Sequence, residues 1–174
     1  RTQWISRVCL FIANGVECRN NQIIRPYKKF HGVILQAIPK HYLEILKSYP
    51  VGHLATSDLN SHPHLIPICY SSDGVSIVSA LDQKPKSTDI RNLKRIKNII
   101  SNPQVALLID RYDHDWQKLW YILISGTATV VEKGSLQKKA VELLVDKYPQ
   151  YQDMHISENP VIQIIPTKIT SWGI

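Results

Sequence analysis

The chain has 174 residues, enough for one domain of ordinary size and too few for two. Hydrophobic residues make up 44% of it and charged residues 20%, a composition that excludes general disorder and a fibrous repeat. Lys and Arg outnumber Asp and Glu by 21 to 14, so the formal charge is +7, which favours an anionic partner such as nucleic acid, a phosphorylated cofactor or an acidic membrane.

The cysteines indicate a reducing compartment. Cys9, Cys18 and Cys69 are widely spaced and contain no C-x-x-C pair, so neither a disulfide framework nor a zinc site is predicted. The apolar run "VCLFIA" is far shorter than the roughly 20 residues of a membrane span, and no small-residue cleavage pattern follows it. We therefore expect a soluble, cytoplasmic protein without a membrane partner.

In chain order, residues 1–36 are predicted to be an N-terminal extension of unclear structure, and residues 37–174 a single domain. Within the extension, Asn14-Gly15 between apolar flanks is typical of a hairpin turn. A short amphipathic helix is predicted after Pro39, because apolar residues recur there at helical spacing until Pro50 ends the segment. Those apolar residues are Tyr42, Ile45, Leu46 and Tyr49.

Three short runs with strand composition follow, each ended by turn residues: "VGHLATS", "HPHLIPICYS" and "GVSIVSAL". A helix is predicted over residues 88–101, with Ser87, Thr88 and Asp89 as capping candidates and a basic outer face. Two more strands, "QVALLID" and "LWYILISGTATVVE", come next, and Gly126 marks an expected bend or bulge.

A third helix is predicted from Ser135 to Tyr148, and a last strand, "VIQIIPTKITSW", closes the chain. Pro166 places that strand at a sheet edge or at a bulge, because proline has no N–H to donate. Strands that follow one another without alternating with helices favour a small antiparallel barrel with peripheral helices over a doubly wound parallel sheet.

Between the third strand and its helix, the segment "DQKPKSTDIRNLKRIKN" concentrates positive charge. Pro85 stiffens the loop ahead of a helix start, where exposed N–H groups already favour an anion. Helical spacing is expected to bring arginines and Asn98 onto one face, where they converge on a phosphate-sized ion. The cations in question are Lys84, Lys86, Arg91 and Arg95. A solvated helix face remains the alternative interpretation.

Other candidate constellations are weaker. His62 and His64 alternate on a strand, but no third ligand lies near them in sequence, so no metal site is predicted. Asp110, Asp113, His114 and Asp115 are expected to be solvated or capping residues of a loop. Cys69 is expected to be inert. Trp116, Trp120 and Tyr121 have two open interpretations: they pack in the core, or they form a wall of a cofactor site.

Four segments occur in a characteristic order: "LATSDLNSHPHLIPICY", "SIVSALDQKPKSTDIRNLKRIKNIISNPQVALLID", "RYDHDWQKLWYILISGTATVVE" and "ITSW". In this order the sequence resembles the pyridoxamine-phosphate-oxidase-like split β-barrel family, closest to its coenzyme F420-dependent branch. The resemblance spans residues 51–172. Its most specific pieces are "DQKPK", "NI" before "NP", and "DW" followed after three residues by W.

The resemblance implies a mainly β fold, a six-stranded antiparallel split β-barrel of Greek-key type with peripheral helices. It also implies a homodimer with FMN or coenzyme F420 in a groove between the protomers. The corresponding function is a flavin- or deazaflavin-dependent oxidoreductase that transfers a hydride to or from an unknown small-molecule substrate.

By resemblance, the second strand passes beside the flavin ring with Ile66, Pro67 and Ile68, and the end of the third strand contributes Ser79 and Ala80. Lys84, Lys86, Arg91 and Arg95 would hold the phosphate. The partner protomer would contribute Trp120, Tyr121 and Trp172. No catalytic acid or base is predicted, although water or Tyr121 is a possible proton source.

The sequence departs from pyridoxamine phosphate oxidase itself. Ile66 stands where that enzyme has a phosphate-reaching arginine, and the chain stops at Ile174 without that enzyme's substrate-binding arginine. Both departures argue against vitamin B6 oxidation. Three alternatives stay open: an FMN-binding barrel without redox catalysis, a haem-binding barrel with His53 or His64 as axial ligand, and a basic nucleic-acid-binding barrel. No RNA-binding signature supports the last, so no nucleic-acid partner is expected.

Overall fold

The structure, a computed structural model, describes residues 17–19, 22–24, 28–30, 33–35, 37–81, 90–154 and 156–174. The chain divides into two compact units, Arg1–Ala37 and Ile38–Ile174. In the first unit, β1 (Glu17–Arg19) pairs with β2 (Gln22–Ile24), and β3 (Lys28–Phe30) pairs with β4 (Val33–Leu35), both antiparallel. The predicted turn at Asn14-Gly15 lies outside the described residues.

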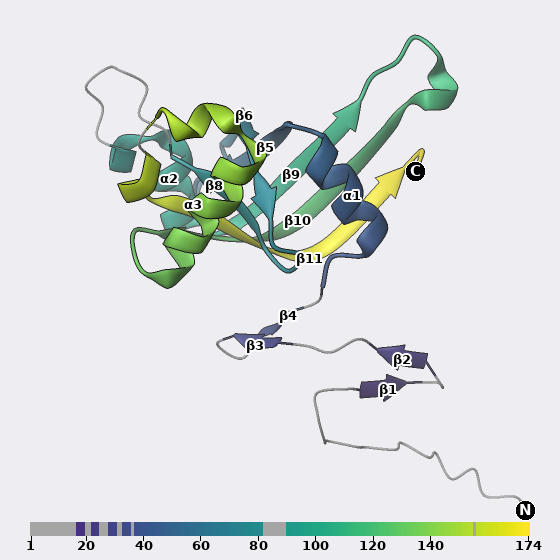
Figure 1. Cartoon of the computed structure of the whole chain (residues 1–174), viewed down its shortest axis with the longest axis horizontal. Coiled ribbons are helices and arrows are strands. Elements are labelled where there is room, and N and C mark those ends of the chain that lie inside the picture. Colours follow the sequence, from purple (N-terminus) through teal and green to yellow (C-terminus); the bar gives the residue numbers. More distant parts are fainter. Residues whose placement is uncertain are drawn as a thin grey trace, which may run out of the picture. The chain divides into compact units, whose positions relative to one another are not determined.

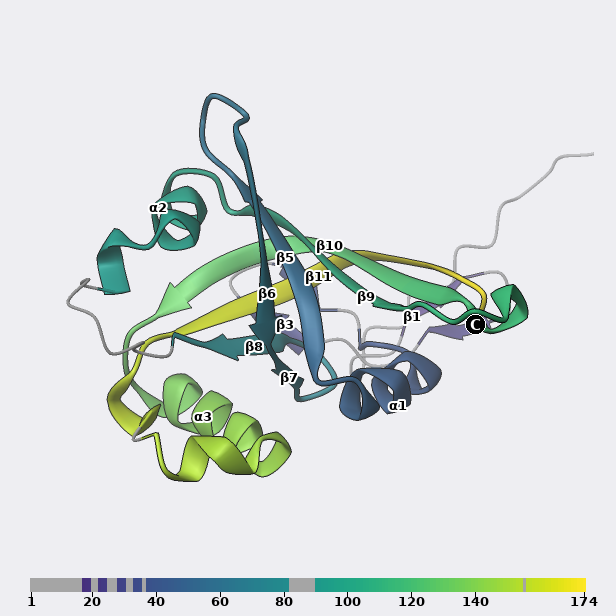
Figure 2. The same cartoon turned by 90° about the horizontal axis from the view of Figure 1, so that it is seen from above.

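The second unit is built around one antiparallel sheet in the strand order β6-β5-β9-β10-β11-β8-β7. Its strands are β5 (Val51–Ser57), β6 (Pro63–Cys69), β7 (Ser71–Ser72), β8 (Ile77–Ala80), β9 (Gln104–Arg111), β10 (Trp120–Val131) and β11 (Val161–Trp172). Figures 1 and 2 show that the sheet curls into a half-barrel, and β6 at one edge comes back into contact with β8.

The helices of this unit are α1 (Lys40–Ser48), α2 (Lys94–Ser101) and α3 (Ser135–Lys147), with short 3₁₀ turns η1 (Ile90–Asn92), η2 (Trp116–Lys118), η3 (Pro149–Gln152) and η4 (Ile156–Glu158). Figure 2 shows α2 on one side of β10 and β11, and α1 and α3 on the other. None of the helices in the described ranges combines the length and the apolar character that crossing a bilayer requires.

The predicted mainly β, antiparallel split-barrel fold with peripheral helices is confirmed, as a sheet curled into a half-barrel, but the predicted number of six strands is wrong, because the described sheet has seven. The segment 62–71, predicted as one strand, forms β6 and β7 with a break at Tyr70. The hydroxyl of Tyr148 accepts a hydrogen bond from the Tyr70 N–H (2.9 Å) and lies 2.7 Å from the Tyr70 carbonyl oxygen. With both backbone groups engaged there, the chain leaves β5 at Cys69 and joins β8 from Ser71.

The bulge expected at Gly126 is present. Ser125 pairs with Lys168 and Gly126 pairs with Pro166, so Thr167 is the extra residue on β11. A Cβ at Gly126 would stand 2.5 Å from the Ile165 carbonyl oxygen, which only glycine avoids. The bulge prediction for Pro166 is therefore confirmed, and the edge prediction also holds locally, since β8 pairs with β11 only over Val161–Ile164 and Pro166 lies beyond that pairing.

The single helix predicted over residues 88–101 is wrong in its first half. The 3₁₀ turn η1 covers Ile90–Asn92, Leu93 is extended (φ −61°, ψ 132°), and α2 begins only at Lys94. Asn98 is 1% exposed and donates to the Thr56 hydroxyl at 3.0 Å. The common face predicted for Arg91, Arg95 and Asn98 therefore does not form, and the capping candidates at 87–89 lie outside the described residues.

Two apolar clusters stabilise the second unit. Inside the curl, Leu54, Leu107, Ile122, Ile124 and Ile164 from four neighbouring strands are fully buried. A second cluster packs α3 against β8 and the start of β11. Because interior side chains alternate with exterior ones along each strand, the opposite face of the sheet, apart from the part under α3, presents exposed side chains such as Leu65 and Pro67.

Candidate functional site

The three residues predicted to lie beside a flavin ring divide between the two faces of β6. Ile68 is 9% exposed in the core and Ile66 packs against it, whereas Pro67 points outward and is exposed. Pro67 lies directly opposite His53 on β5, and His53 lies opposite Leu108 on β9. Of the three, Pro67 alone therefore belongs to the outer face of the sheet.

The two residues predicted from the third strand are enclosed within the fold of the chain. Ser79 is 2% exposed and Ala80 is 6% exposed. Ala80 belongs to the cluster under α3. Because neighbouring residues of a strand point to opposite faces, Ser79 and Ala80 lie on the two sides of β8, and both side chains face protein.

At the corner between β8 and α2, Arg91 is the best exposed of the predicted phosphate-binding cations described. Its guanidinium donates to both carboxylate oxygens of Glu132, at 3.2 and 3.3 Å. Both side chains are more than half exposed, so the pair is weak and easily exchanged. Arg95 is half-buried, and Lys84 and Lys86 lie outside the described residues.

Arg91 and Glu132 border a cavity of about 530 Å³. Its walls are mainly apolar and come from the end of β8, from α2, from β10 and from the start of β11. They include Leu81, Ile96, Ile99, Ile100, Val130 and Pro160. Among the described residues, the charges at its border are the paired side chains of Arg91 and Glu132, and its volume falls in the range of small-molecule sites.

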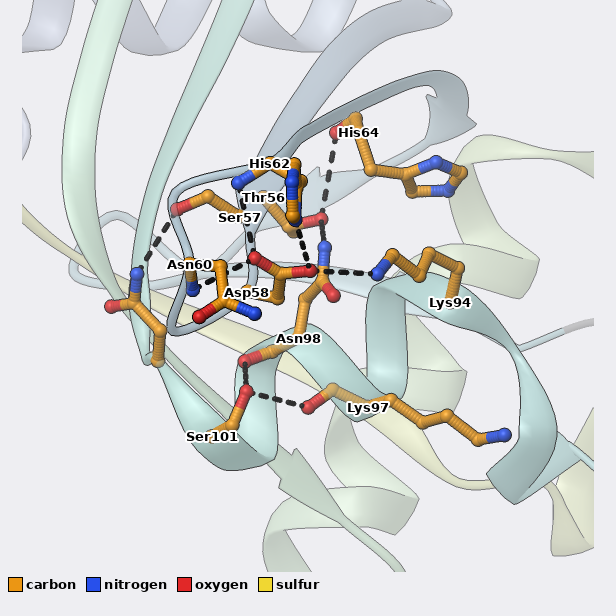
Figure 3. Close-up of polar contacts among 11 residues, drawn as sticks. Thr56, Ser57, Asp58, Asn60, His62, His64, Lys94, Lys97, Asn98 and Ser101 are labelled. Carbon is orange, nitrogen blue, oxygen red and sulfur yellow. Dashed lines mark hydrogen bonds and ion pairs between the residues drawn. The ribbon is translucent and has the colours of Figure 1, made fainter.

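Lys94 is directed elsewhere. Asp58, in the β5–β6 turn, accepts hydrogen bonds from the N–H groups of Asn60 and His62 and from Lys94 Nζ, each at 3.0 Å (Figure 3). The contacts with His62 and Lys94 hold the pKa of Asp58 well below its usual range. The turn is thereby bound to α2, and Asn102 adds a bond to the Ser57 hydroxyl at 3.0 Å.

The sequence indicated only part of this turn. Asp in a turn commonly accepts hydrogen bonds from the N–H groups of residues that follow it, so this part can be predicted from the sequence. Its ion pair with Lys94, 36 residues away, depends on how α2 packs on the hairpin and had no local signal.

At the other end of the sheet, two of the three predicted aromatic residues come together. Tyr121 and Trp172 lie opposite each other on β10 and β11, with ring centroids 6.5 Å apart and planes inclined by 20°. They are 40% and 55% exposed. Trp120 points to the opposite face and packs edge-on against Tyr49 at 4.5 Å. All three aromatic residues of the set line a shallow cavity of about 310 Å³, so Trp120 serves both as packing and as wall.

The sequence did not single out the pair formed by His53 and Asp110 as a unit. His53 Nδ1 lies 3.5 Å from the Asp110 carboxylate, and the two side chains are 42% and 43% exposed. Asp110 lies opposite Tyr121. The pair therefore sits on the outer face between Pro67 and the aromatic end. Finding it required the pairing of β5 with β9, which are not consecutive in the chain.

The loop acids Asp113 and Asp115 have the predicted local roles. Asp113 accepts from the Asp115 N–H at 3.0 Å and from Arg111 at 2.7 Å, and Asp115 accepts from the Gln117 N–H at 3.1 Å. Within the described ranges, no three His, Cys, Asp or Glu side chains gather as a metal ion would need.

Residues 39–171 match the family model described as pyridoxamine 5'-phosphate oxidase. A comparison with curated protein sequences finds no match. Among solved structures, a conserved hypothetical protein from Mycobacterium tuberculosis aligns with a TM-score of 0.62 at 18% identity, over 78% of this chain and 86% of the other.

A candidate pyridoxamine 5'-phosphate oxidase from Listeria innocua aligns with a TM-score of 0.57 at 22% identity, over 77% of this chain and 97% of the other. The haem storage protein HutZ from Vibrio cholerae aligns with a TM-score of 0.60 at 11% identity, over 76% of this chain and 92% of the other. Identities this low indicate a shared fold. The family match covers more than half of the sequence, and the chain belongs to the pyridoxamine 5'-phosphate oxidase family.

Proposed function

We propose that the chain is a flavin- or deazaflavin-dependent oxidoreductase that binds FMN or coenzyme F420 between the protomers of a homodimer. Membership of the pyridoxamine 5'-phosphate oxidase family is the observation that carries this proposal. The substrate is a small molecule, because the cavities are sized for small ligands.

The residues present fit the phosphate end of such a cofactor. Arg91 holds its guanidinium fork at the border of an apolar cavity, and its exposed pairing with Glu132 can exchange for a phosphate. Lys84 and Lys86 precede it in the chain, and Arg95 follows. These four cations would hold and orient the phosphate without taking part in the reaction.

The outer face of the sheet fits the ring end. Pro67 offers a rigid apolar contact, and its neighbours on that face include Leu65, which is 63% exposed. Ile66, Ile68, Ser79 and Ala80 would support this surface from within. A second copy packed on this face would bring its own Tyr121 and Trp172 to the ring and exclude water from it, while its Trp120, which points to the opposite face, would support them from behind.

When bound, a flavin or deazaflavin supplies hydride transfer. The chain would contribute binding, orientation and exclusion of water, and the hydroxyl of Tyr121, a residue that is 40% exposed, is a candidate proton donor to a reduced substrate. An unchanged single-turnover rate in Tyr121→Phe would remove Tyr121 from that role.

The proposal is tested by titrating the full chain with FMN and with F420 and following cofactor fluorescence. Lys86→Glu and Arg95→Glu are expected to weaken binding of the preferred cofactor at least about tenfold, because each places a negative charge near the phosphate. Lys138→Glu on the exposed side of α3 is the matched control and should have no effect. Affinities unchanged by both reversals, or no binding of either cofactor, would contradict the proposal.

A second candidate function is haem binding, and the geometry of His53 favours it. A ligating histidine commonly has its other ring nitrogen oriented by a carboxylate, and Asp110 lies 3.5 Å from His53 Nδ1. HutZ shows that the fold occurs in a haem storage protein. A Soret band that appears on addition of haem and is lost in His53→Ala would select this function, and its persistence in that variant would reject His53 as the ligand.

A further inference from the structure

Three consecutive residues, two at the end of β5 and one in the turn that follows, each bond to one residue along α2 and its C-terminal cap. The three bonds, each 3.0 Å long, join Asp58 to Lys94, Thr56 to Asn98 and Ser57 to Asn102 (Figure 3). The partners on the helix are spaced four residues apart. Because residues at this spacing lie on one face of a helix, a single polar side of α2 is bound to the end of β5 along its whole length.

The remaining attachment of α2 to the core is apolar. Ile96 and Ile99 are 1% and 3% exposed in the main core cluster. Apolar contacts are non-directional, so they hold this helix of eight residues to the sheet without fixing its position along the strand. Hydrogen bonds are directional, and the bond between Thr56 and Asn98 is shielded from water, since the two residues are 3% and 1% exposed. The polar side therefore fixes where α2 lies.

The position of α2 determines the position of two predicted phosphate-binding cations. Arg95 lies on α2, and Arg91 lies on the turn η1 that leads into it. Because Leu93 between them is extended, no preceding helical turn holds the start of α2. Lys94 is the first residue of the helix, and it is the residue that Asp58 bonds. A start of α2 released from Asp58 would move both guanidinium groups.

We propose that Thr56, Ser57 and Asp58 are positioning residues that hold α2 where Arg91 and Arg95 meet the phosphate of the cofactor. This inference rests on the proposed function and adds residues that act on the phosphate only through the helix. Asp58 allows a decisive test, because a carboxylate repels a phosphate. Loss of its charge would by electrostatics alone tighten cofactor binding, whereas loss of its positioning role would weaken binding.

The preferred cofactor, FMN or F420, and its phosphate-free counterpart, riboflavin or the deazariboflavin core of F420, are titrated into the full chain and followed by fluorescence. Asp58→Asn keeps an oxygen for the turn N–H groups but removes the charge that holds Lys94. It is expected to weaken cofactor binding about tenfold and to leave binding of the phosphate-free counterpart unchanged. Thr56→Val, which removes a hydroxyl without a change in charge, should do the same, and Thr56→Ser should retain wild-type binding.

Asp73→Asn is the matched control. Asp73 also accepts two N–H groups within a turn and has a lysine 3.8 Å away, but that lysine, Lys139, belongs to α3. This variant should change neither affinity. Amide hydrogen exchange without cofactor should be faster in α2 of Asp58→Asn and Thr56→Val, and unchanged in Asp73→Asn.

Three results would overturn the positioning role and leave the flavin function intact. They are cofactor binding that is unchanged or tighter in Asp58→Asn, equal losses for the cofactor and its phosphate-free counterpart, and unchanged exchange in α2. A wild-type chain that binds neither FMN nor F420 would instead overturn the proposed function, and this inference with it.

Discussion

At the scale of single residues, one hydroxyl determines where the sheet changes partner. Tyr148 follows α3, and its hydroxyl lies within hydrogen-bond distance of the Tyr70 N–H, the Tyr70 carbonyl (2.7 Å) and the Pro50 carbonyl (2.8 Å). Those backbone groups belong to the point where β6 ends and to the residue before β5. A buried backbone group without a partner costs free energy, so this hydroxyl stabilises the break between β6 and β7.

Tyr148→Phe is expected to lower the free energy of unfolding by about 2 kcal/mol, because it leaves buried backbone groups unpaired while keeping the ring. Urea denaturation followed by circular dichroism measures the change. Tyr112→Phe is the control, since Tyr112 is 70% exposed and should give a change near zero. Equal stability of the two variants would show that the hydroxyl of Tyr148 is not needed at the strand break.

At the scale of elements, Lys147 joins the end of α3 to the end of α1. Its ammonium donates to the carbonyls of Leu46 (2.6 Å) and Tyr49 (2.9 Å) and lies 3.9 Å from the Tyr70 ring centroid. These carbonyls lie at the C-terminus of α1, where a cation is favoured. Burial lowers the pKa of Lys147 to about 8, and burial also raises the pKa of Tyr148 to about 12.

The lowered pKa of Lys147 predicts how stability depends on pH. Between its folded pKa of about 8 and its ordinary value of 10.5, the unfolded chain binds the additional proton. The free energy of unfolding should therefore rise with pH in that window. Measured by urea denaturation at about pH 7 and about pH 9.5, the difference between wild type and Lys147→Met should grow with pH. Lys138→Met should show no such growth, and a constant difference in Lys147→Met would contradict the lowered pKa.

The elements also show which parts of the fold a sequence can predict. The strands Val51–Ser57 and Val161–Trp172 match their predicted ranges, because alternation and turn residues are local signals. The bulge at Gly126 and Pro166 was likewise predicted from local signals, the glycine and the proline themselves. The break at Tyr70 was not, since Tyr148 lies 78 residues away. The extended Leu93 that divides the predicted helix also had no signal, because apolar spacing continues through it.

The residues of the candidate site likewise fall into those that the sequence predicted and those that depend on tertiary packing. The basic segment was predicted from its local charge pattern, whereas Pro67 and the aromatic residues were predicted from the family resemblance. The pair of His53 and Asp110 depends on the packing of β5 beside β9, and the placement of Lys94 depends on the docking of α2. Contacts between elements distant in the chain are set by tertiary packing, which periodicity does not encode.

At the scale of the larger unit, the curled sheet covers its inner face with a core and leaves an outer face that is partly apolar. Val51, Leu65, Tyr121 and Trp172 on this face are 45%, 63%, 40% and 55% exposed. Contiguous exposed apolar surface on a folded domain is typical of an interaction site. The proposed homodimer would cover this face and place the cofactor between the two copies.

Analytical ultracentrifugation of the full chain with FMN or F420, recorded at the visible absorption of the cofactor, tests the central claim most directly. The account predicts that the cofactor sediments with a species of twice 19.9 kDa and that Lys86→Glu removes cofactor absorbance from that boundary. Cofactor absorbance that stays with the solvent, or that sediments with a single chain of 19.9 kDa, would contradict it.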